Sequence, residues 1–193
     1  MARSALLNIM VQAATKAGRS LTRDFGEVEN LQVSVKGPGD YVSAADKGTD
    51  PLHRWIVDPL DGTTNFLHSL PIFAVSIALE REGKLVAGVI YNPITEELFT
   101  AEKGSGAFMN DRRMRVAARR NLADAALCTA IPHIGTKKLG RYLEEAKVSS
   151  AHAAAVRGLG SAALSLAWVA AGRFDAYYER NLQRWDEAAG ILF

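Results

Sequence analysis

The chain has 193 residues, 48% of them hydrophobic, and its 23 Lys and Arg residues nearly balance its 21 Asp and Glu residues. This composition is typical of a globular protein with a buried core, and it excludes a disordered or collagen-like chain. The net charge of +2 is too small to indicate binding to nucleic acid or to a membrane through bulk electrostatics. Cys128 is the single cysteine, which excludes an intrachain disulfide and a zinc site built from cysteines.

The first 24 residues predict an amphipathic helix rather than a signal peptide, because basic residues interrupt every apolar run. An apolar stripe recurs at three- and four-residue spacing and comprises Leu6, Ile9, Met10, Ala13, Ala17 and Leu21. No apolar run in the sequence approaches the roughly 18 residues that a membrane span needs. We therefore expect a cytoplasmic protein that does not associate with a membrane.

The centre of the sequence predicts an antiparallel sheet. A short apolar strand from Trp55 to Val57 runs into Asp58, and residues 74–109 follow as a meander of about four strands. Gly104-Ser105-Gly106 is too short for a dinucleotide-binding motif and is expected to form a hairpin turn.

The second half of the sequence predicts helices, over 139–146, over 161–171 with Gly172 as the stop, and from near Asp186 onward. Cys128 lies in a short apolar segment, so we expect it to pack in the core. Helices at both ends of a large mixed sheet predict a layered α/β fold of the α+β type.

The segment from Asp58 to Phe66, with the sequence DPLDGTTNF, carries the strongest chemical signal. The carboxylates of Asp58 and Asp61, with the Leu60 carbonyl between them, can converge on one point and offer the oxygen ligands that suit Mg²⁺. The amides and hydroxyls that follow can receive a phosphate. An Asx turn followed by a capped helix explains the same residues without a ligand, and composition alone leaves both readings open.

The DPLDGTTNF segment resembles the metal-binding motif of the inositol monophosphatase family of Mg²⁺-dependent, lithium-sensitive phosphatases. Residues 185–190 (WDEAAG) resemble the C-terminal motif of that family, and residues 40–46 (DYVSAAD) resemble its N-terminal motif. The resemblance covers essentially the whole chain. It implies a layered α-β-α-β-α sandwich with a large mixed, mainly antiparallel sheet, and a homodimer.

The same resemblance implies a site with two or three Mg²⁺ ions. Asp58, the Leu60 carbonyl and Asp61 would be ligands of the first metals, and Asp186 would complete the shell of a second metal. Asp186 fits a simple helix cap equally well, although a carboxylate at a helix start can both cap and bind. Thr63 and Asp46 match positions that orient the attacking water or hold a third metal, whereas Asp46 alone would be an ordinary surface aspartate.

For the substrate, the resemblance gives a phosphate site and a ring site. The phosphate would bind the amides of Gly62 and Thr63. The residues that would contact the rest of the substrate are Gly160, Ser161, Ala162, Glu179 and Asp186. A carboxylate at Glu179 can accept hydrogen bonds from a polyol and would repel a second phosphate, which favours a monophosphate. Without the resemblance, Glu179 would be a strand-end charge in solvent.

The sequence also departs from the family pattern. Only Lys47 to Arg54 separate Asp46 from Trp55, where the family has a helix and a Gly-Glu-Glu motif, and the chain stops at Phe193 within the last helix. We therefore expect residues 1–193 to form a single but incomplete inositol-monophosphatase-like domain, without the segment near 47–53 and the C-terminal part. It is either a degenerate protein or the ordered subset of a longer chain.

The expected activity is hydrolysis of inositol monophosphate, or a similar sugar or polyol monophosphate, by metal-activated water. A fructose bisphosphatase and a nucleotide 3'-phosphatase are alternatives of the same chemistry. A non-catalytic interaction module is an alternative of another class. Its surface would be the basic run Arg112, Arg113, Arg115, Arg119 and Arg120. This run has no interleaved aromatic residues, so we expect a solvated face rather than an RNA-binding surface, and no nucleic-acid partner.

Overall fold

A computed structural model describes residues 3–27, 52–130 and 139–193 of the chain. The motif at residues 40–46, which includes Asp46, and most of the segment near 47–53 lie outside these ranges. Of the helices in the described ranges, none is long and apolar enough to cross a membrane.

Six strands form the larger sheet, which is antiparallel throughout and follows the order of the chain. They are β1 (His53–Asp61), β2 (Ala74–Arg81), β3 (Lys84–Asn92), β4 (Glu97–Glu102), β5 (Gly106–Met109) and β6 (Arg112–Arg113). The meander and the hairpin turn at Gly104 are confirmed. β1 is longer than the sequence predicts, because it continues to Asp61, with an irregularity in its pairing with β2 between Asp58 and Asp61.

Three strands form a second, parallel sheet in the order β8-β7-β9. They are β7 (Ala126–Thr129), β8 (Ala155–Gly158) and β9 (Ala176–Tyr178). Parallel neighbours need crossover connections, and helices α3 (Leu139–His152) and α4 (Ala162–Ala170) supply them. The parallel pairing that was expected within one mixed sheet therefore occurs in a sheet of its own. Cys128 on β7 is fully buried, as predicted.

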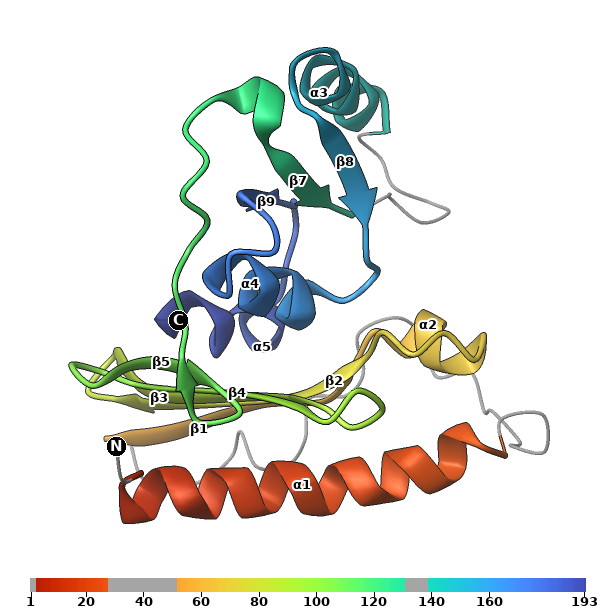
Figure 1. Ribbon diagram of the computed structural model, residues 1–193. Coiled ribbons are helices and arrows are strands. Elements are labelled where there is room, and N and C mark those ends of the chain that lie inside the picture. The colour runs from red at the N-terminus through yellow and green to blue at the C-terminus, as the bar shows by residue number, and fades with distance from the viewer. Residues whose placement is uncertain (1–2, 28–51, 131–138) are drawn as a thin grey trace.

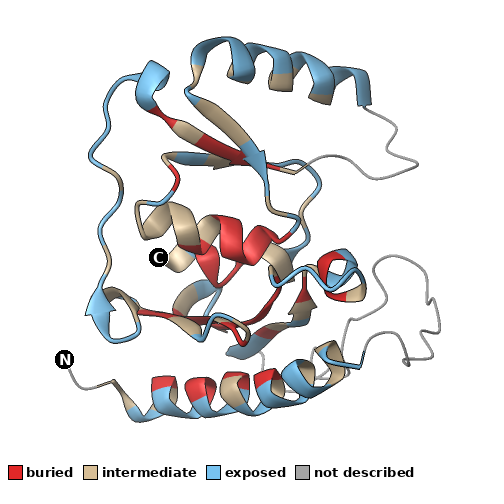
Figure 2. Cartoon of the chain, turned by 45° about the vertical axis from the view of Figure 1, so that its right-hand side comes forward, coloured by how far each residue is buried: buried red, intermediate tan, exposed pale blue. Residues whose placement is uncertain are grey.

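The elements stack in five layers (Figure 1). Helix α1 (Ala5–Phe25) covers one face of the larger sheet, and α4 and the short helix α5 (Arg184–Glu187) cover the other face. The parallel sheet lies beyond α4, and α3 forms the outermost layer. The layered α-β-α-β-α fold is thus confirmed. The buried residues concentrate on β2, β3 and β4, on α4, and on the side of α1 that faces the sheet (Figure 2).

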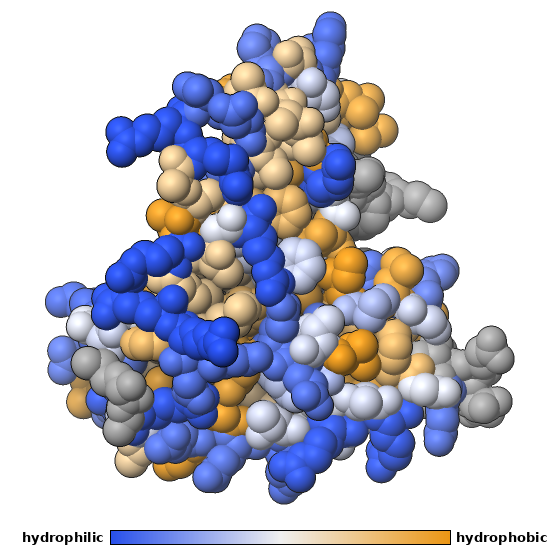
Figure 3. Space-filling view, in the orientation of Figure 1, coloured by the Kyte–Doolittle hydropathy of each residue, from blue (hydrophilic) through white to orange (hydrophobic). Residues whose placement is uncertain are grey.

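The buried face of helix α1 agrees only in part with its predicted apolar stripe, since Met10 is buried and Leu6, Ala17 and Leu21 pack against the core. Its buried residues are Leu7, Met10, Val11, Ala14 and Gly18. Ile9 is 61% exposed and Ala13 is also exposed, so the prediction was wrong for these two residues. The helix approaches the sheet closely at Gly18, where a Cβ atom would lie 2.6 Å from Cε1 of Tyr91. Hydrophilic residues dominate the outward face of the helix (Figure 3).

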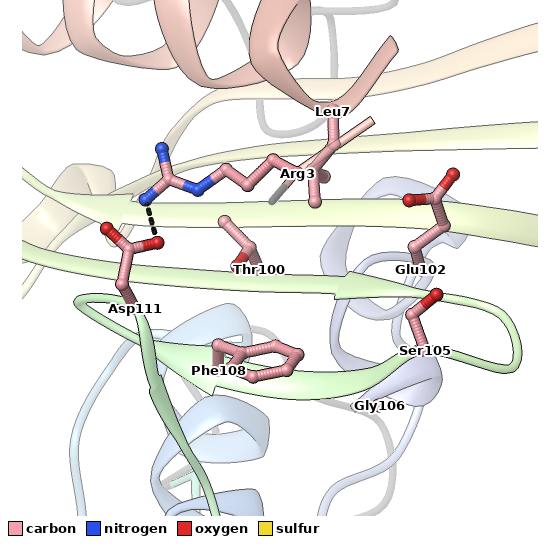
Figure 4. A pocket seen from close by; sticks show the side chains of 8 residues that line it. All are labelled: Arg3, Leu7, Thr100, Glu102, Ser105, Gly106, Phe108 and Asp111. Atoms are coloured by element: carbon pink, nitrogen blue, oxygen red, sulfur yellow. Dashed lines mark hydrogen bonds and ion pairs between the residues drawn. The ribbon is translucent and has the colours of Figure 1, made fainter. Parts of the chain in front are cut away.

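An ion pair fastens the beginning of α1 to the far edge of the larger sheet. The Arg3 guanidinium lies 2.6 Å from Asp111, in the turn between β5 and β6 (Figure 4). The two side chains border a small cavity of about 40 Å³, together with Leu7 and Phe108. This contact links the start of the helix to the edge of the sheet opposite to β1, which carries the motif.

Candidate metal centre

The end of β1 delivers two carboxylates to one place. Asp58 precedes the irregular end of the strand, where its Oδ1 accepts a hydrogen bond of 3.0 Å from the Leu60 amide. Asp61 closes the strand and is buried. Gly62 then turns the chain with a φ of +88°, and a Cβ at this position would lie 2.8 Å from the Ile72 carbonyl oxygen. The turn into helix α2 (Thr63–Leu67) therefore requires glycine.

A third carboxylate reaches the same place from helix α5, which packs against β1 and β2 of the larger sheet. Asp186 lies in the first turn of α5 and accepts a hydrogen bond of 2.7 Å from the Gln183 amide, so it caps its own helix. One oxygen each of Asp58, Asp61 and Asp186 lies within 4.8 Å of the others. The structure thus brings together the three carboxylates that the sequence singled out, and Asp186 has the capping role as well.

Burial and mutual repulsion make this cluster unfavourable in its ionised form. Burial is the main cause that raises the pKa of Asp61 to about 7, and repulsion from Asp58 adds to it against the hydrogen bond from Ser161. Burial, opposed by the Leu60 amide, also raises the pKa of Asp58 to about 6, with repulsion from Asp186 adding to the rise. The pKa of Asp186 is raised by burial too. Such a set of hard oxygen donors fits a divalent cation like Mg²⁺.

The cluster borders a cavity of about 260 Å³. The residues that line it are Asp58, Leu60, Asp61, Gly62, Thr63, Gln183, Trp185 and Asp186. Five of them come from the predicted motif at the end of β1 and three from the start of α5. Nothing in the sequence pointed to Gln183. Trp185 lies in the WDEAAG motif, but the sequence analysis assigned it no role in the site.

Thr63 is exposed, and its hydroxyl donates a hydrogen bond of 3.0 Å to the Leu60 carbonyl oxygen. The Leu60 carbonyl was itself expected to be a metal ligand. Because a carbonyl oxygen has two lone pairs, this bond leaves one of them for another partner. The hydroxyl oxygen of Thr63 likewise keeps its acceptor capacity toward the cavity that it lines.

Of the five residues expected to contact the rest of the substrate, Asp186 lines this cavity, whereas Gly160, Ser161, Ala162 and Glu179 do not. The Ser161 hydroxyl donates to Oδ2 of Asp61, and the Ala162 amide donates to Oδ1 of Asp61 at 3.3 Å. Gly160 has a φ of +73°. Glu179 is exposed, and its carboxylate accepts a hydrogen bond from the Tyr177 hydroxyl.

Sequence reasoning missed the structural role of Asn65, the residue that follows the two threonines of the motif. Its side-chain amide is buried and donates two hydrogen bonds of 2.7 Å, to the carbonyls of Ile72 and Leu159. It therefore ties α2 to the segment that leads into α4. The signal available in the sequence was a polar amide between Thr64 and Phe66 of the DPLDGTTNF motif.

The basic run lies on β6 and on the extended segment that connects the two sheets. All five arginines are exposed. Arg119 is 2.7 Å from Asp175 and also donates to the Gly172 carbonyl, so one member of the run holds the second half of the chain in place.

Comparisons of the sequence and of the fold with known proteins agree on one family. The model of the inositol monophosphatase family matches residues 47–193. A protein of Rhizobium meliloti (strain 1021) named inositol-1-monophosphatase is 56% identical over 220 residues, which covers 100% of this chain and 83% of the relative. A protein of the same name from Mesorhizobium japonicum is 58% identical, with the same coverage.

A crystal structure of extragenic suppressor protein suhB from Bartonella henselae superimposes with a TM-score of 0.90 at 57% identity, covering 98% of this chain and 83% of that one. The identity and the coverage are high in both comparisons. The chain therefore belongs to the inositol monophosphatase family, a family of phosphatase enzymes.

Proposed function

We propose that this protein hydrolyses inositol monophosphate, or a similar polyol or sugar monophosphate, to the free polyol and inorganic phosphate. The observation that carries the proposal is the cluster of Asp58, Asp61 and Asp186 beside a cavity. Relatives that are more than half identical over the whole chain are named for this activity. Three carboxylates with raised pKa values at one point are typical of a functional site, which favours an enzyme over a non-catalytic module.

Asp58, Asp61 and Asp186 would hold Mg²⁺, in two or three ions, together with the Leu60 carbonyl. Their donor atoms are all oxygen, and their repulsion is relieved by a cation. When bound, Mg²⁺ supplies an activated water and neutralises phosphate charge. Inhibition by Li⁺ belongs to the same proposal and is supported by the family resemblance of the motif.

The phosphate would be positioned by the turn at Gly62. The first amides of a helix have no acceptor within that helix, and α2 starts directly after Gly62. The amides of Gly62 and Thr63 are therefore the proposed donors to the phosphate oxygens. The Thr63 hydroxyl already donates to the Leu60 carbonyl, so its oxygen would accept from the attacking water and orient it. Asp46 is proposed to help orient this water or to hold a third metal.

The polyol would lie toward Gly160, Ser161, Ala162 and Glu179. Glu179 is exposed at the end of β9, so its carboxylate is open to solvent, and it is paired with Tyr177. A carboxylate there would accept hydrogen bonds from ring hydroxyls and would repel a second phosphate. This arrangement supports a monophosphate rather than fructose bisphosphate.

We also propose that this single domain lacks an internal segment that its relatives carry near residues 47–53. The alignment with the Rhizobium meliloti protein runs over 220 positions while covering all 193 residues of this chain. At least 27 positions of that alignment therefore have no residue here. A homodimer in the cytoplasm completes the proposal, and it is supported by the family resemblance.

Release of phosphate from inositol 1-phosphate tests the proposal, with Mg²⁺ in one arm and EDTA in the other. We expect turnover with Mg²⁺ alone. A panel containing fructose 1,6-bisphosphate and a nucleotide 3'-phosphate distinguishes the proposed substrate from the two alternatives of the same chemistry. Absence of turnover on all of them would favour an interaction module that uses the basic run.

A further inference from the structure

The first turn of α4 holds the side chain of Asp61 from behind. Ser161 is the N-cap of this helix, and its hydroxyl donates to Oδ2 of Asp61. The Ala163 amide donates to the same oxygen at 3.1 Å, and the Ala162 amide donates to Oδ1 at 3.3 Å. Three donors about one hundred residues away in the sequence thus converge on one carboxylate.

These bonds give the two carboxylate oxygens of Asp61 different surroundings. A carboxylate oxygen has two lone pairs, and Oδ2 accepts two hydrogen bonds whereas Oδ1 accepts one. Among the described residues, Oδ1 accepts one hydrogen bond, from the Ala162 amide, and so keeps one lone pair for another partner. The carboxylate is therefore held in one orientation, with one oxygen committed to α4 and the other available at the cavity that Asp61 lines.

The Ser161 hydroxyl is itself fixed by the helix that it caps. It accepts a hydrogen bond of 3.2 Å from the Leu164 amide while it donates to Asp61. One turn further, the Ser165 hydroxyl donates to the Ser161 carbonyl at 2.6 Å and lies 3.3 Å from the Cys128 sulfur on β7. Ser161 and Ser165 are 3% and 2% exposed, so neither hydroxyl is free to turn to solvent.

We propose that Ser161 is a positioning residue for the metal centre, which acts by locking the Asp61 carboxylate, in addition to or in place of any contact with the substrate ring. This inference rests on the proposed function, because it assumes that Asp61 is a metal ligand. Hydrogen-bond partners of metal ligands typically change metal affinity about 10- to 100-fold when they are removed. Ser161 is expected to follow that rule, although it touches no metal.

The test measures Mg²⁺ affinity by isothermal titration calorimetry rather than turnover. Ser161→Ala removes the donor to Asp61 and is expected to weaken Mg²⁺ binding about tenfold or more. Ser161→Thr keeps the hydroxyl and is expected to restore affinity to within about threefold of the original. Ser165→Ala is the matched control, because it deletes a buried hydroxyl from the same helix that does not contact Asp61.

Ser161→Gly serves where Ser161→Ala fails to fold, because glycine is tolerated at an N-cap. Equal Mg²⁺ affinity in the original protein and in the variant without the hydroxyl would overturn the inference, and so would an equal loss in Ser165→Ala. If the original protein bound no Mg²⁺, the proposed metal centre would be wrong and the inference would fall with it. Mg²⁺ binding and phosphate release by the original protein, without a difference between the serine variants, would refute the inference alone.

Discussion

Replacing Asp61 by asparagine should change how the stability of the metal-free protein depends on pH. The unfolded chain releases the Asp61 proton near the usual pKa of 3.8, whereas the folded chain releases it near a pKa of about 7. Between these values the folded state holds the additional proton, so the free energy of unfolding falls as the pH rises through this window and becomes level above it. An asparagine side chain does not titrate, so this part of the dependence should vanish in Asp61→Asn.

The size of the effect follows from the interval between the two pKa values. Each pH unit corresponds to about 1.4 kcal/mol, so ionised Asp61 costs the metal-free fold about 4 kcal/mol above pH 7. Between pH 5 and pH 8, the original protein should lose about 3 kcal/mol more than Asp61→Asn does. This is a large share of the about 5–15 kcal/mol that stabilises a typical domain. The asparagine oxygen can still accept from the Ala163 amide, so the variant should fold.

Urea unfolding in EDTA at pH 5, 6, 7 and 8 measures this difference. Asp124→Asn is the control, because Asp124 is an exposed carboxylate in the short 3₁₀ helix Leu122–Asp124 and does not belong to the carboxylate cluster. Saturating Mg²⁺ should restore the stability of the original protein at pH 8 and leave Asp61→Asn almost unchanged. Parallel losses in the original protein and in Asp61→Asn would refute the assignment of a buried, repelled carboxylate.

Three further predictions follow from other residues. Gly62→Ala should lower the free energy of unfolding by about 1–3 kcal/mol in urea, because of its positive φ and the contact with the Ile72 carbonyl, whereas an unchanged midpoint would contradict the described turn. Glu179→Gln should raise KM for inositol 1-phosphate more than it lowers kcat, and an unchanged KM would remove Glu179 from the substrate site. Cys128 should stay unreactive toward a thiol reagent in the native protein and react on unfolding, because burial raises the pKa of its thiol; rapid native labelling would show that β7 is open.

Local patterns in the sequence predicted the parts of the fold that depend on neighbours in the chain. The meander of β2 to β5 follows from apolar runs separated by turn residues, and the helix after Ser161 follows from its cap and from Gly172. The face of α1 was predicted only in part, because the stripe included Ile9 and Ala13, which are exposed, and omitted Gly18. The close approach of Gly18 to Tyr91 cannot be read from the helix sequence itself.

The candidate metal centre shows the same limit. Asp58 and Asp61 are three residues apart and could be paired from the sequence, and Asp186 was added by resemblance to a family motif. The contact between Ser161 and Asp61 spans one hundred residues, so spacing could not reveal that Ser161 holds the carboxylate. Gln183 lines the cavity because of how α5 begins, which depends on packing against the larger sheet.

The central claim is that the carboxylate cluster makes this chain a metal-dependent phosphatase, and one assay tests it most directly. Phosphate release from inositol 1-phosphate is measured at pH 8 with and without Mg²⁺ for the original protein, Asp61→Asn and Asp124→Asn. The account predicts Mg²⁺-dependent turnover in the original protein and in Asp124→Asn, and a loss of several orders of magnitude in Asp61→Asn. Turnover in Asp61→Asn close to that of the original protein, or turnover that persists in EDTA, would contradict it.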